Sequence, residues 1–561
     1  MRINLVKVFL IIIIILYQTT AYSKKIDNKF NHKYLSNYFS AIISYDNQNN
    51  KDALKFFNSS KYLLQKHDNF LKEYVFSLIS DGQVSKAIKQ IKFSKNQNNS
   101  NFFEANILLA IDAINKKNFS NASELLYDES IYEETSRFET IIYQTLRSYN
   151  SLFLNKEIEK KYQNFGQLDL ITKAFQNCYL NSESKKSYFL DLINLNTGDY
   201  SRYLFFYLIN LIEKKDYDSV RQISSTIDLL NNGLLISQAK KWIEKSNFEK
   251  FKKFFSCKNE SDILGEFFFL ISNLYASEEE YEKSNFYLNI SNYLNPKFYF
   301  NLSLLAENYY INNNFILSKK VLENFNENDE IYNWFKEKKI SQIISEIEND
   351  DNALEFIEKK YKNYTKPNIR IIFDMANIYK SLKKYNRAVE HYSLILSIIG
   401  ENSSTYADVL YKRGGSYERL NDYENADKDL LKSLDIVPED PYVMNYLAYS
   451  WLERNIKISE AIKMLERAYK QKKNDPYIID SVGWAYYLIG DYKKAEKFLK
   501  EAIQLMPEDP IVNDHYGDIL WMLDRKLQAR YFWKSVLNLK ETEEEMKKKA
   551  LEKLLNGLDK I

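Results

Sequence analysis

The sequence predicts an all-α protein, built as an array of paired helices. Three observations predict it: only 12 glycines and 7 prolines in 561 residues, apolar side chains at helical spacing, and small residues that recur every 34 or so positions. Sheet-rich folds and α/β enzymes use glycine and proline in turns and phosphate loops, and a typical chain contains about 12% of the two together. Because 45% of the residues are apolar and 15% aromatic, burial offsets the chain entropy and disorder is not expected.

The first 23 residues read as a secretory signal peptide. Arg2 and Lys7 precede ten uninterrupted apolar residues, Val8 to Tyr17, and a short polar stretch ends at Ser23. As a helix the apolar run is about 15 Å long, half the hydrocarbon core of a bilayer, so we expect cleavage after Ser23. The alternative is an uncleaved, membrane-associated signal anchor. No later apolar stretch reaches spanning length, so no transmembrane helix is expected in the mature chain, and in a Gram-negative cell that chain is periplasmic.

The charge balance excludes one class of partner. The chain has 78 Lys and Arg against 76 Asp and Glu, and the surplus is Arg2 and Lys7 of the leader. A formally neutral mature protein lacks the basic excess that neutralises phosphates. We therefore expect no nucleic-acid partner.

The repeat is most regular near the C-terminus. Three units carry the same kinds of residue at matching offsets: an apolar residue, then glycine, then tyrosine or leucine, and later alanine and a large apolar residue. They contain Leu410, Gly414, Tyr417, Ala426, Leu430, Ser433 and Pro438; then Pro476, Val482, Gly483, Tyr486, Ala495, Leu499, Ala502 and Pro507; then Pro510, Tyr516, Gly517, Leu520, Ala529, Trp533 and Val536. Apolar positions three or four apart share one face of a first helix, here called helix A. Small residues at positions eight and twenty let the second helix, helix B, approach closely, and proline suits a helix start and stops a helix interior.

The alanine at position twenty of each unit shows where the repeats start along the chain. Ala53, Ala87 and Ala122 give units that start near residues 34, 68 and 103. Ser284, Ser318, Ala353 and Ala388 give starts near 265, 299, 334 and 369, followed by starts near 407, 441 (with Ala461 in the alanine slot), 476 and 510. All seven prolines fall at or beside a junction between units. The predicted segments are 1–23 (signal peptide), 34–136 and 263–365 (repeats), 366–540 (well-matched repeats), and 137–262 and 541–561, treated next.

The stretch 137–262 has only a weak repeat signal. One unit there starts near Tyr200, with Ser219 in the alanine slot. We interpret it as degenerate helical hairpins, and the alternative is a helical insertion that interrupts the array. An oxidising compartment permits a bridge between Cys178 and Cys257, but two cysteines 79 residues apart are more often separate buried thiols, which is the expectation here.

The tail 541–561 is a charged amphipathic helix. Met546, Ala550, Leu551 and Leu554 form its apolar stripe. Terminal repeats need a polar outer face, so the tail is predicted to be a capping helix. A partner-binding tail is the alternative.

The pattern resembles the 34-residue tetratricopeptide repeat, which has large, Leu, Gly or small, Tyr, then Ala, Phe or Leu, small and Pro. The resemblance implies a right-handed α-solenoid that holds peptides or proteins on a concave face, through helix-A positions two, five, nine and twelve. In the three best-matched units it assigns these positions to Tyr442, Asn445, Tyr449, Tyr477, Asp480, Trp484, Tyr487, Ile511, Asp514, Asp518 and Trp521. The alternative is that several of them contact only the neighbouring repeat.

No catalytic, cofactor or metal motif accompanies the repeats. The four histidines, His32, His67, His391 and His515, match no metal-ligand spacing, and no Walker loop, dinucleotide fingerprint or nucleophile elbow occurs. His515 sits in the tempting run Asn513 to Asp518, yet its repeat phase makes it an ordinary helix-A residue. We therefore expect no enzyme, no cofactor and no metal.

A closer likeness concerns the run from Asn445 to Trp521 and the N-terminal segment YLSNYFSAIISYDNQNNKDALKFF, which resemble long proteobacterial envelope proteins with tetratricopeptide repeats. Some of those are lipoprotein adaptors that deliver cell-wall hydrolases to a carboxy-terminal processing protease; this chain lacks their lipobox cysteine. The resemblance implies a non-enzymatic envelope scaffold or adaptor, with an envelope protease or its substrate as a candidate partner. The alternative is a structural protein that binds peptidoglycan or lipid.

Overall fold

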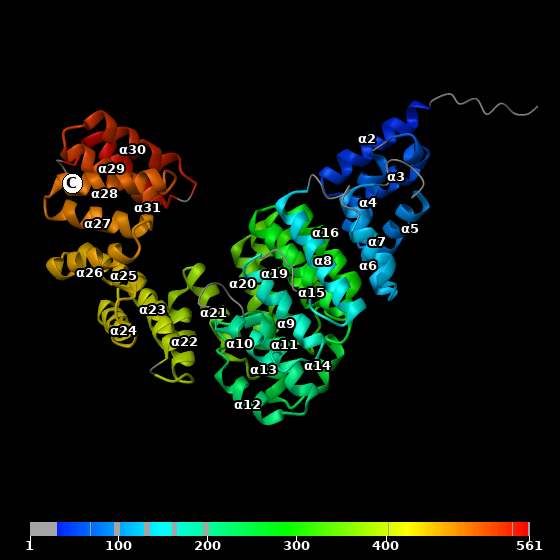
Figure 1. The fold of residues 1–561 in the computed structure, drawn as a ribbon. Helices are drawn as coiled ribbons and strands as arrows, with labels where there is room; N and C mark the ends of the chain where they lie inside the picture. The colour runs from blue at the N-terminus through cyan, green and yellow to red at the C-terminus, as the bar shows by residue number, and fades with distance from the viewer. Residues whose placement is uncertain are drawn as a thin grey trace, which may run out of the picture. The chain divides into compact units, whose positions relative to one another are not determined.

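The computed structural model describes residues 31–67, 69–94, 101–127, 135–159, 165–194, 201–401, 403–540 and 542–558, and the regular structure within these ranges is helical (Figure 1). The predicted all-α class is confirmed. Among the described residues, no helix combines the length and the apolar content that crossing a bilayer requires. The leader, residues 1–23, lies outside these ranges, so its cleavage stays a prediction.

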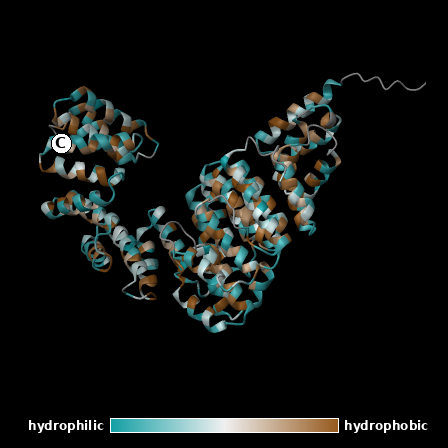
Figure 2. Cartoon of the chain, in the orientation of Figure 1, coloured by the Kyte–Doolittle hydropathy of each residue, from teal (hydrophilic) through white to brown (hydrophobic). Residues whose placement is uncertain are grey.

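The chain divides into two compact units. The first consists of Met1–Ser224 and Gln238–Lys336, and the second of Ser225–Ser237 and Glu337–Ile561. Helices in both units carry mixed hydropathy, with hydrophobic and hydrophilic residues interleaved along each ribbon (Figure 2). Each helix therefore has an apolar side to bury against its neighbours.

The first unit is a succession of helical hairpins. Its helices are α2 (His32–Asp46), α3 (Asn50–Ser59), η1 (Lys61–Gln65), α4 (Phe70–Ser80), α5 (Val84–Ser94), α6 (Phe103–Asn115), α7 (Phe119–Leu126), α8 (Arg137–Asn155), α9 (Gln167–Tyr179), α10 (Lys185–Ile193), α11 (Ser201–Glu213), α12 (Tyr217–Thr226), α13 (Leu234–Glu244), α14 (Glu249–Phe254), α15 (Glu260–Ser277), α16 (Tyr281–Leu294), η4 (Tyr299–Asn301), α17 (Leu302–Ile311), α18 (Phe315–Leu322) and α19 (Glu330–Ile347). The boundary between the two units falls within α12, α13 and α19.

In this unit the chain also packs on parts of itself that are distant in sequence. Helix α16 contacts α4 and α5, and α15 contacts α6 and α8. The Ser261 hydroxyl of α15 donates to Asn115 Oδ1 at 2.7 Å. Stacking of each hairpin on its sequence neighbours, which the repeat pattern predicts, therefore does not account for all the packing in this unit.

The stretch 137–262 is helical where it is described, and its anchors are long-range contacts. A disulfide joins Cys178 at the end of α9 to Cys257 between α14 and α15, with 5.7 Å between the two Cα atoms. The expectation of two separate thiols is therefore wrong: the fold brings together cysteines that their 79-residue separation does not show to be neighbours.

A buried ion pair is the second anchor of this region. Arg202 of α11 donates from Nε and Nη2 to the two carboxylate oxygens of Glu266 in α15, each at 2.7 Å. The Glu266 side chain is 1% exposed. The guanidinium also lies 3.9 Å from the centre of the Phe269 ring. The pair ties the degenerate stretch to the regular repeat that follows it.

The second unit continues the hairpins in a more regular form. Its helices are α20 (Asp350–Tyr361), α21 (Ile369–Ser381), α22 (Tyr385–Leu396), α23 (Ser404–Arg419), α24 (Tyr423–Ile436), α25 (Pro441–Glu453), α26 (Ile458–Gln471), α27 (Pro476–Leu488), α28 (Tyr492–Leu505), α29 (Pro510–Met522), α30 (Lys526–Asn538) and α31 (Glu544–Asn556). Each odd-numbered helix from α21 to α29 packs on the helix that follows it, so these pairs are the predicted helices A and B.

Proline and aspartate mark where the A helices of the last three repeats begin; these helices, α25, α27 and α29, are called the inner helices below. Pro441, Pro476 and Pro510 are the first residues of α25, α27 and α29. In each case the preceding aspartate accepts hydrogen bonds from two backbone N–H groups of the first turn, as a helix N-cap does. The other four prolines, Pro296, Pro367, Pro438 and Pro507, also lie between hairpins, so the predicted junctions are confirmed.

The alanine position is buried in nearly every unit. The side chains that the register places there are at most 4% exposed at Ala53, Ala87, Ala122, Ser284, Ser318, Ala353, Ala388, Ala426, Ala461, Ala495 and Ala529. Ser219 is the exception: it is half-buried, and its neighbour Val220 is fully buried instead. The register in the degenerate stretch is therefore shifted by one residue.

Two glycines show why position eight is small. A Cβ added at Gly483 would lie 2.6 Å from Cγ of Leu499 and 3.1 Å from the Leu499 backbone nitrogen. A Cβ at Gly517 would lie 2.5 Å from Cδ1 of Trp533. Helices A and B cross at these points with no room for a side chain.

One segment of the second unit comes from far upstream. Residues 225–237 belong to this unit, and Arg370 at the start of α21 holds them. Its Nη1 donates to the carbonyl oxygens of Leu229 at 3.1 Å and Asn232 at 2.6 Å, and to Ser237 Oγ at 3.2 Å. The second unit is thus assembled from two separate parts of the chain.

Candidate functional site: the inner helices of the last three repeats

The inner helices α25, α27 and α29 carry every predicted ligand-binding residue. Position two of each repeat bears a large exposed side chain: Tyr442, Tyr477 and Ile511 are 47%, 59% and 48% exposed. Exposed aromatic and aliphatic groups repeated at one structural position form a row, and such rows mark interaction surfaces more often than scattered exposed residues do.

Position five carries a row of polar acceptors. Asn445, Asp480 and Asp514 each have a buried Oδ1 that, among the described residues, accepts no hydrogen bond. Asp480 is 5% exposed, and the other two side chains are half-buried. Buried polar groups in proteins are nearly always paired, so three unpaired acceptors at equivalent positions are unusual.

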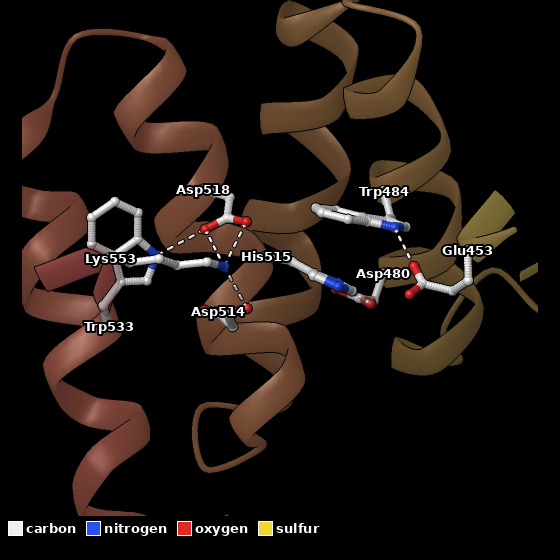
Figure 3. A network of polar contacts seen from close by, with 8 residues as sticks. All are labelled: Glu453, Asp480, Trp484, Asp514, His515, Asp518, Trp533 and Lys553. Carbon is white, nitrogen blue, oxygen red and sulfur yellow. Dashed lines mark hydrogen bonds and ion pairs between the residues drawn. The ribbon is translucent and has the colours of Figure 1, made fainter. Parts of the chain in front are cut away.

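His515 lies at the centre of the site, which the sequence did not indicate. Its Nδ1 is 2.9 Å from Asp480 Oδ2 of the preceding repeat, and both side chains are buried. Burial alone lowers the pKa of His515, but the Asp480 carboxylate outweighs it and raises that pKa above its ordinary value. His515 is thus a helix-A residue, as its repeat phase predicts, and its imidazole also bonds to the carboxyl group of the preceding repeat (Figure 3).

An aromatic stack covers the imidazole. The Trp484 indole lies parallel to the His515 ring with 4.0 Å between ring centres, and Tyr487 stacks on Trp484 with 4.7 Å between theirs. The indole N–H donates to Glu453 Oε1 of α25 at 2.9 Å (Figure 3). Trp484 is thus fixed by groups from three successive repeats and stays partly exposed.

Tyr449 of α25 completes this wall. Its ring centre is 6.4 Å from that of His515. Burial, followed by Glu453 and Asp480, raises the pKa of Tyr449, and burial with Asp518 raises that of Tyr487. Both phenols therefore remain protonated and can donate hydrogen bonds to a ligand.

Asp518 belongs to a second cluster that involves the C-terminal helix. It accepts from Trp533 Nε1 at 2.9 Å and from Lys553 Nζ of α31 at 2.8 Å (Figure 3). Burial and the neighbouring Asp514 raise the pKa of Asp518 to about 6. Burial lowers the pKa of Lys553, but the two carboxylates outweigh it and hold that pKa above its usual value.

Trp521, the last predicted ligand residue, packs inside the chain. It is 8% exposed, its ring centre is 5.3 Å from that of Trp533, and a Cβ at Gly557 would lie 2.1 Å from its Cζ2. The stripe of α31 also differs from the predicted one, since Leu551 is 48% exposed. The side of α31 turned toward the repeat consists of Met546, Ala550, Lys553 and Leu554.

The chemistry of the site is that of recognition. Among the described residues, no group of three His, Cys, Asp or Glu side chains could hold a metal ion. The arrangement offers aromatic faces, protonated phenols and unpaired acceptor oxygens along three adjacent helices. Glu453, His515 and Lys553 were missed in the sequence because each acts through a residue 31 to 39 positions away.

Models of the tetratricopeptide repeat match three stretches of the chain. They cover residues 369–402, 407–440 and 477–509. These correspond to the units predicted to start at 369, 407 and 476, so the resemblance to this repeat is confirmed there.

Curated relatives match over part of their length. A TPR repeat-containing protein of Pseudomonas aeruginosa is 32% identical over 111 residues, 20% of this chain and 19% of that protein. Human tetratricopeptide repeat protein 16 is 25% identical over 158 residues, 26% of this chain and 17% of that protein. The chain thus spans about a fifth of the length of each.

Solved structures of other proteins match at low identity. A tetratricopeptide repeat protein from Parabacteroides merdae is 18% identical, with a TM-score of 0.37, over 46% of this chain and 99% of that one. Yeast Tom70 is 14% identical, with a TM-score of 0.36, over 93% of this chain and 95% of that one.

Proposed function

We propose that the tetratricopeptide repeats of this chain form an exported, non-enzymatic scaffold that holds a protein or peptide partner on helices α25, α27 and α29. The observation that carries the proposal is the repeated surface on these helices: Tyr442, Tyr477 and Ile511 stand exposed in register, beside the partly exposed Trp484 stack. Aromatic residues dominate binding energy at protein interfaces, and paired polar groups fix the orientation of a bound segment.

An adaptor role in the cell envelope is the finer form of the proposal. The resemblance of the C-terminal repeats to envelope adaptors supports it, with an envelope protease or one of its substrates as the partner. The P. aeruginosa protein matches this chain over only 111 residues, 19% of its own length, so the partner is proposed by class alone.

The test of partner binding is crosslinking in the native cell followed by affinity purification of the full chain. Trp484→Ala is expected to reduce capture of the partner at least about 30-fold, the effect of a hot-spot residue worth about 2 kcal/mol. Tyr531→Ala is the matched control, because Tyr531 is an exposed aromatic residue (68%) on the helix B α30. Unchanged capture by Trp484→Ala, with the variant folded, would reject the inner-helix surface.

Export is supported by the leader and by the disulfide. Disulfides persist in oxidising compartments and are rare in the cytosol, so the Cys178–Cys257 bridge suits a periplasmic protein. N-terminal sequencing of the protein from the periplasmic fraction is expected to begin at Lys24. A cytosolic protein that starts at Met1, with both thiols reduced, would contradict export.

A further inference from the structure

The ammonium group of Lys553 is held entirely by carboxylates of the last inner helix. Its Nζ donates to Asp514 Oδ2 at 2.7 Å and to both oxygens of Asp518, each at 2.8 Å. An ammonium group has three protons, so these carboxylates saturate it. The Lys553 side chain is 11% exposed. The two aspartates therefore form a socket whose size and charge match one primary ammonium.

A second observation concerns acceptor oxygens that Lys553 does not use. Asp480, 5% exposed, keeps one buried carboxylate oxygen that no donor in the described ranges reaches, and so does Asp514. Next to the socket there is thus acceptor capacity that the chain does not use. The backbone N–H groups or side-chain donors of a bound segment would satisfy it.

The attachment of α31 is shallow. Ala550 is its one fully buried residue, and Leu551 and Leu555 are 48% and 72% exposed. Beside Ala550, only half-buried apolar side chains such as Met546 and Leu554 hold the helix against the repeat, and the ion pair of Lys553 is a buried polar anchor. An anchor of this kind can be exchanged for a chemically equal group from outside.

We propose that Asp514 and Asp518 are a recognition site for a lysine side chain of the partner, and that Lys553 occupies this site until the partner arrives. The inference rests on the proposed function and names the chemistry of its partner. Binding exchanges one ammonium for another, so charge is conserved in the socket. Lysine fits better than arginine, because the three contacts converge on a single nitrogen, whereas a guanidinium presents a planar fork.

The test is binding of a short fluorescent peptide of alternating glycine and lysine to the full chain, measured by anisotropy. Lys553→Met is expected to bind it about tenfold more tightly than the wild type, because the internal competitor is gone. Lys549→Met is the matched control: it removes the same charge from α31, where the side chain is 67% exposed. Adding Asp518→Asn to Lys553→Met is expected to abolish the gain.

Three outcomes would overturn the inference. They are equal affinities for Lys553→Met and Lys549→Met, an equal gain for the arginine version of the peptide, and a gain that survives Asp518→Asn. A measurement on the wild type does not depend on the folding of any variant. Saturating lysine peptide is expected to speed amide hydrogen exchange in α31, because it displaces Lys553. An unchanged rate of hydrogen exchange would also overturn this displacement. If Trp484→Ala loses the cellular partner while these experiments fail, the proposed function stands and only this inference falls.

Discussion

Replacing Glu266 with alanine is expected to lower the free energy of unfolding of the first unit by about 3–5 kcal/mol. The Arg202 guanidinium, 18% exposed, would lose both of its 2.7 Å bonds and remain as an uncompensated charge against Phe269. Denaturant unfolding, followed by hydrogen exchange of α11 and α15, measures the loss.

Two control variants separate pairing from packing. Arg202→Met combined with Glu266→Leu removes both charges and is expected to recover most of the stability, because apolar replacements of a buried pair are often neutral. Glu249→Ala breaks the ion pair with Lys252 at the surface, where the Glu249 side chain is 73% exposed, and is expected to leave the free energy of unfolding nearly unchanged. A single Glu266→Ala variant as stable as Glu249→Ala would contradict the role given to the pair.

Removing the disulfide is the second large change. Cys178→Ser is expected to destabilise the first unit by about 2–4 kcal/mol, because the bridge closes a loop of 79 residues and restricts the unfolded chain. The melting temperature of the first unit is the measurement. A reductant is expected to reproduce the shift in the wild type and to have no further effect on Cys178→Ser, and a wild type insensitive to reductant would contradict the prediction.

The sequence predicts the fold best where the local pattern is also the packing pattern. Ala495 and Gly483 are small for the same reason that the structure shows, a close crossing of α27 and α28. Pro476 and Pro510 begin helices because proline suits the first turn. These requirements lie within one hairpin, so a single sequence reveals them.

The packing of the stretch 137–262 cannot be predicted in the same way, because the contacts that hold it join residues far apart in the sequence. Arg202 pairs with Glu266, which lies 64 residues further along the chain, and Cys178 is bonded to Cys257, which lies 79 residues further along. Neither partner has a mark in the sequence that identifies the other. The one-residue error at Ser219 has the same origin, since Val220 and not a small residue fills the crossing there.

The sequence predicts which helices carry the site, but it does not predict the contacts that their side chains make. Repeat phase correctly places Tyr442, Tyr477 and Trp484 on inner helices with exposed or partly exposed side chains. Phase alone cannot show that His515 reaches Asp480 across the repeat boundary, or that Lys553 reaches Asp518 from the tail. Those contacts depend on how each hairpin is rotated on the next.

The hold of Arg370 on residues 225–237 has a consequence for biosynthesis. The acceptors at Leu229 and Ser237 leave the ribosome 133 to 141 residues before their donor. During translation the segment 225–237 therefore emerges before the Arg370 side chain that binds it. A nascent chain stalled before residue 370 would present it to chaperones and proteases, and release of that residue would end the exposure.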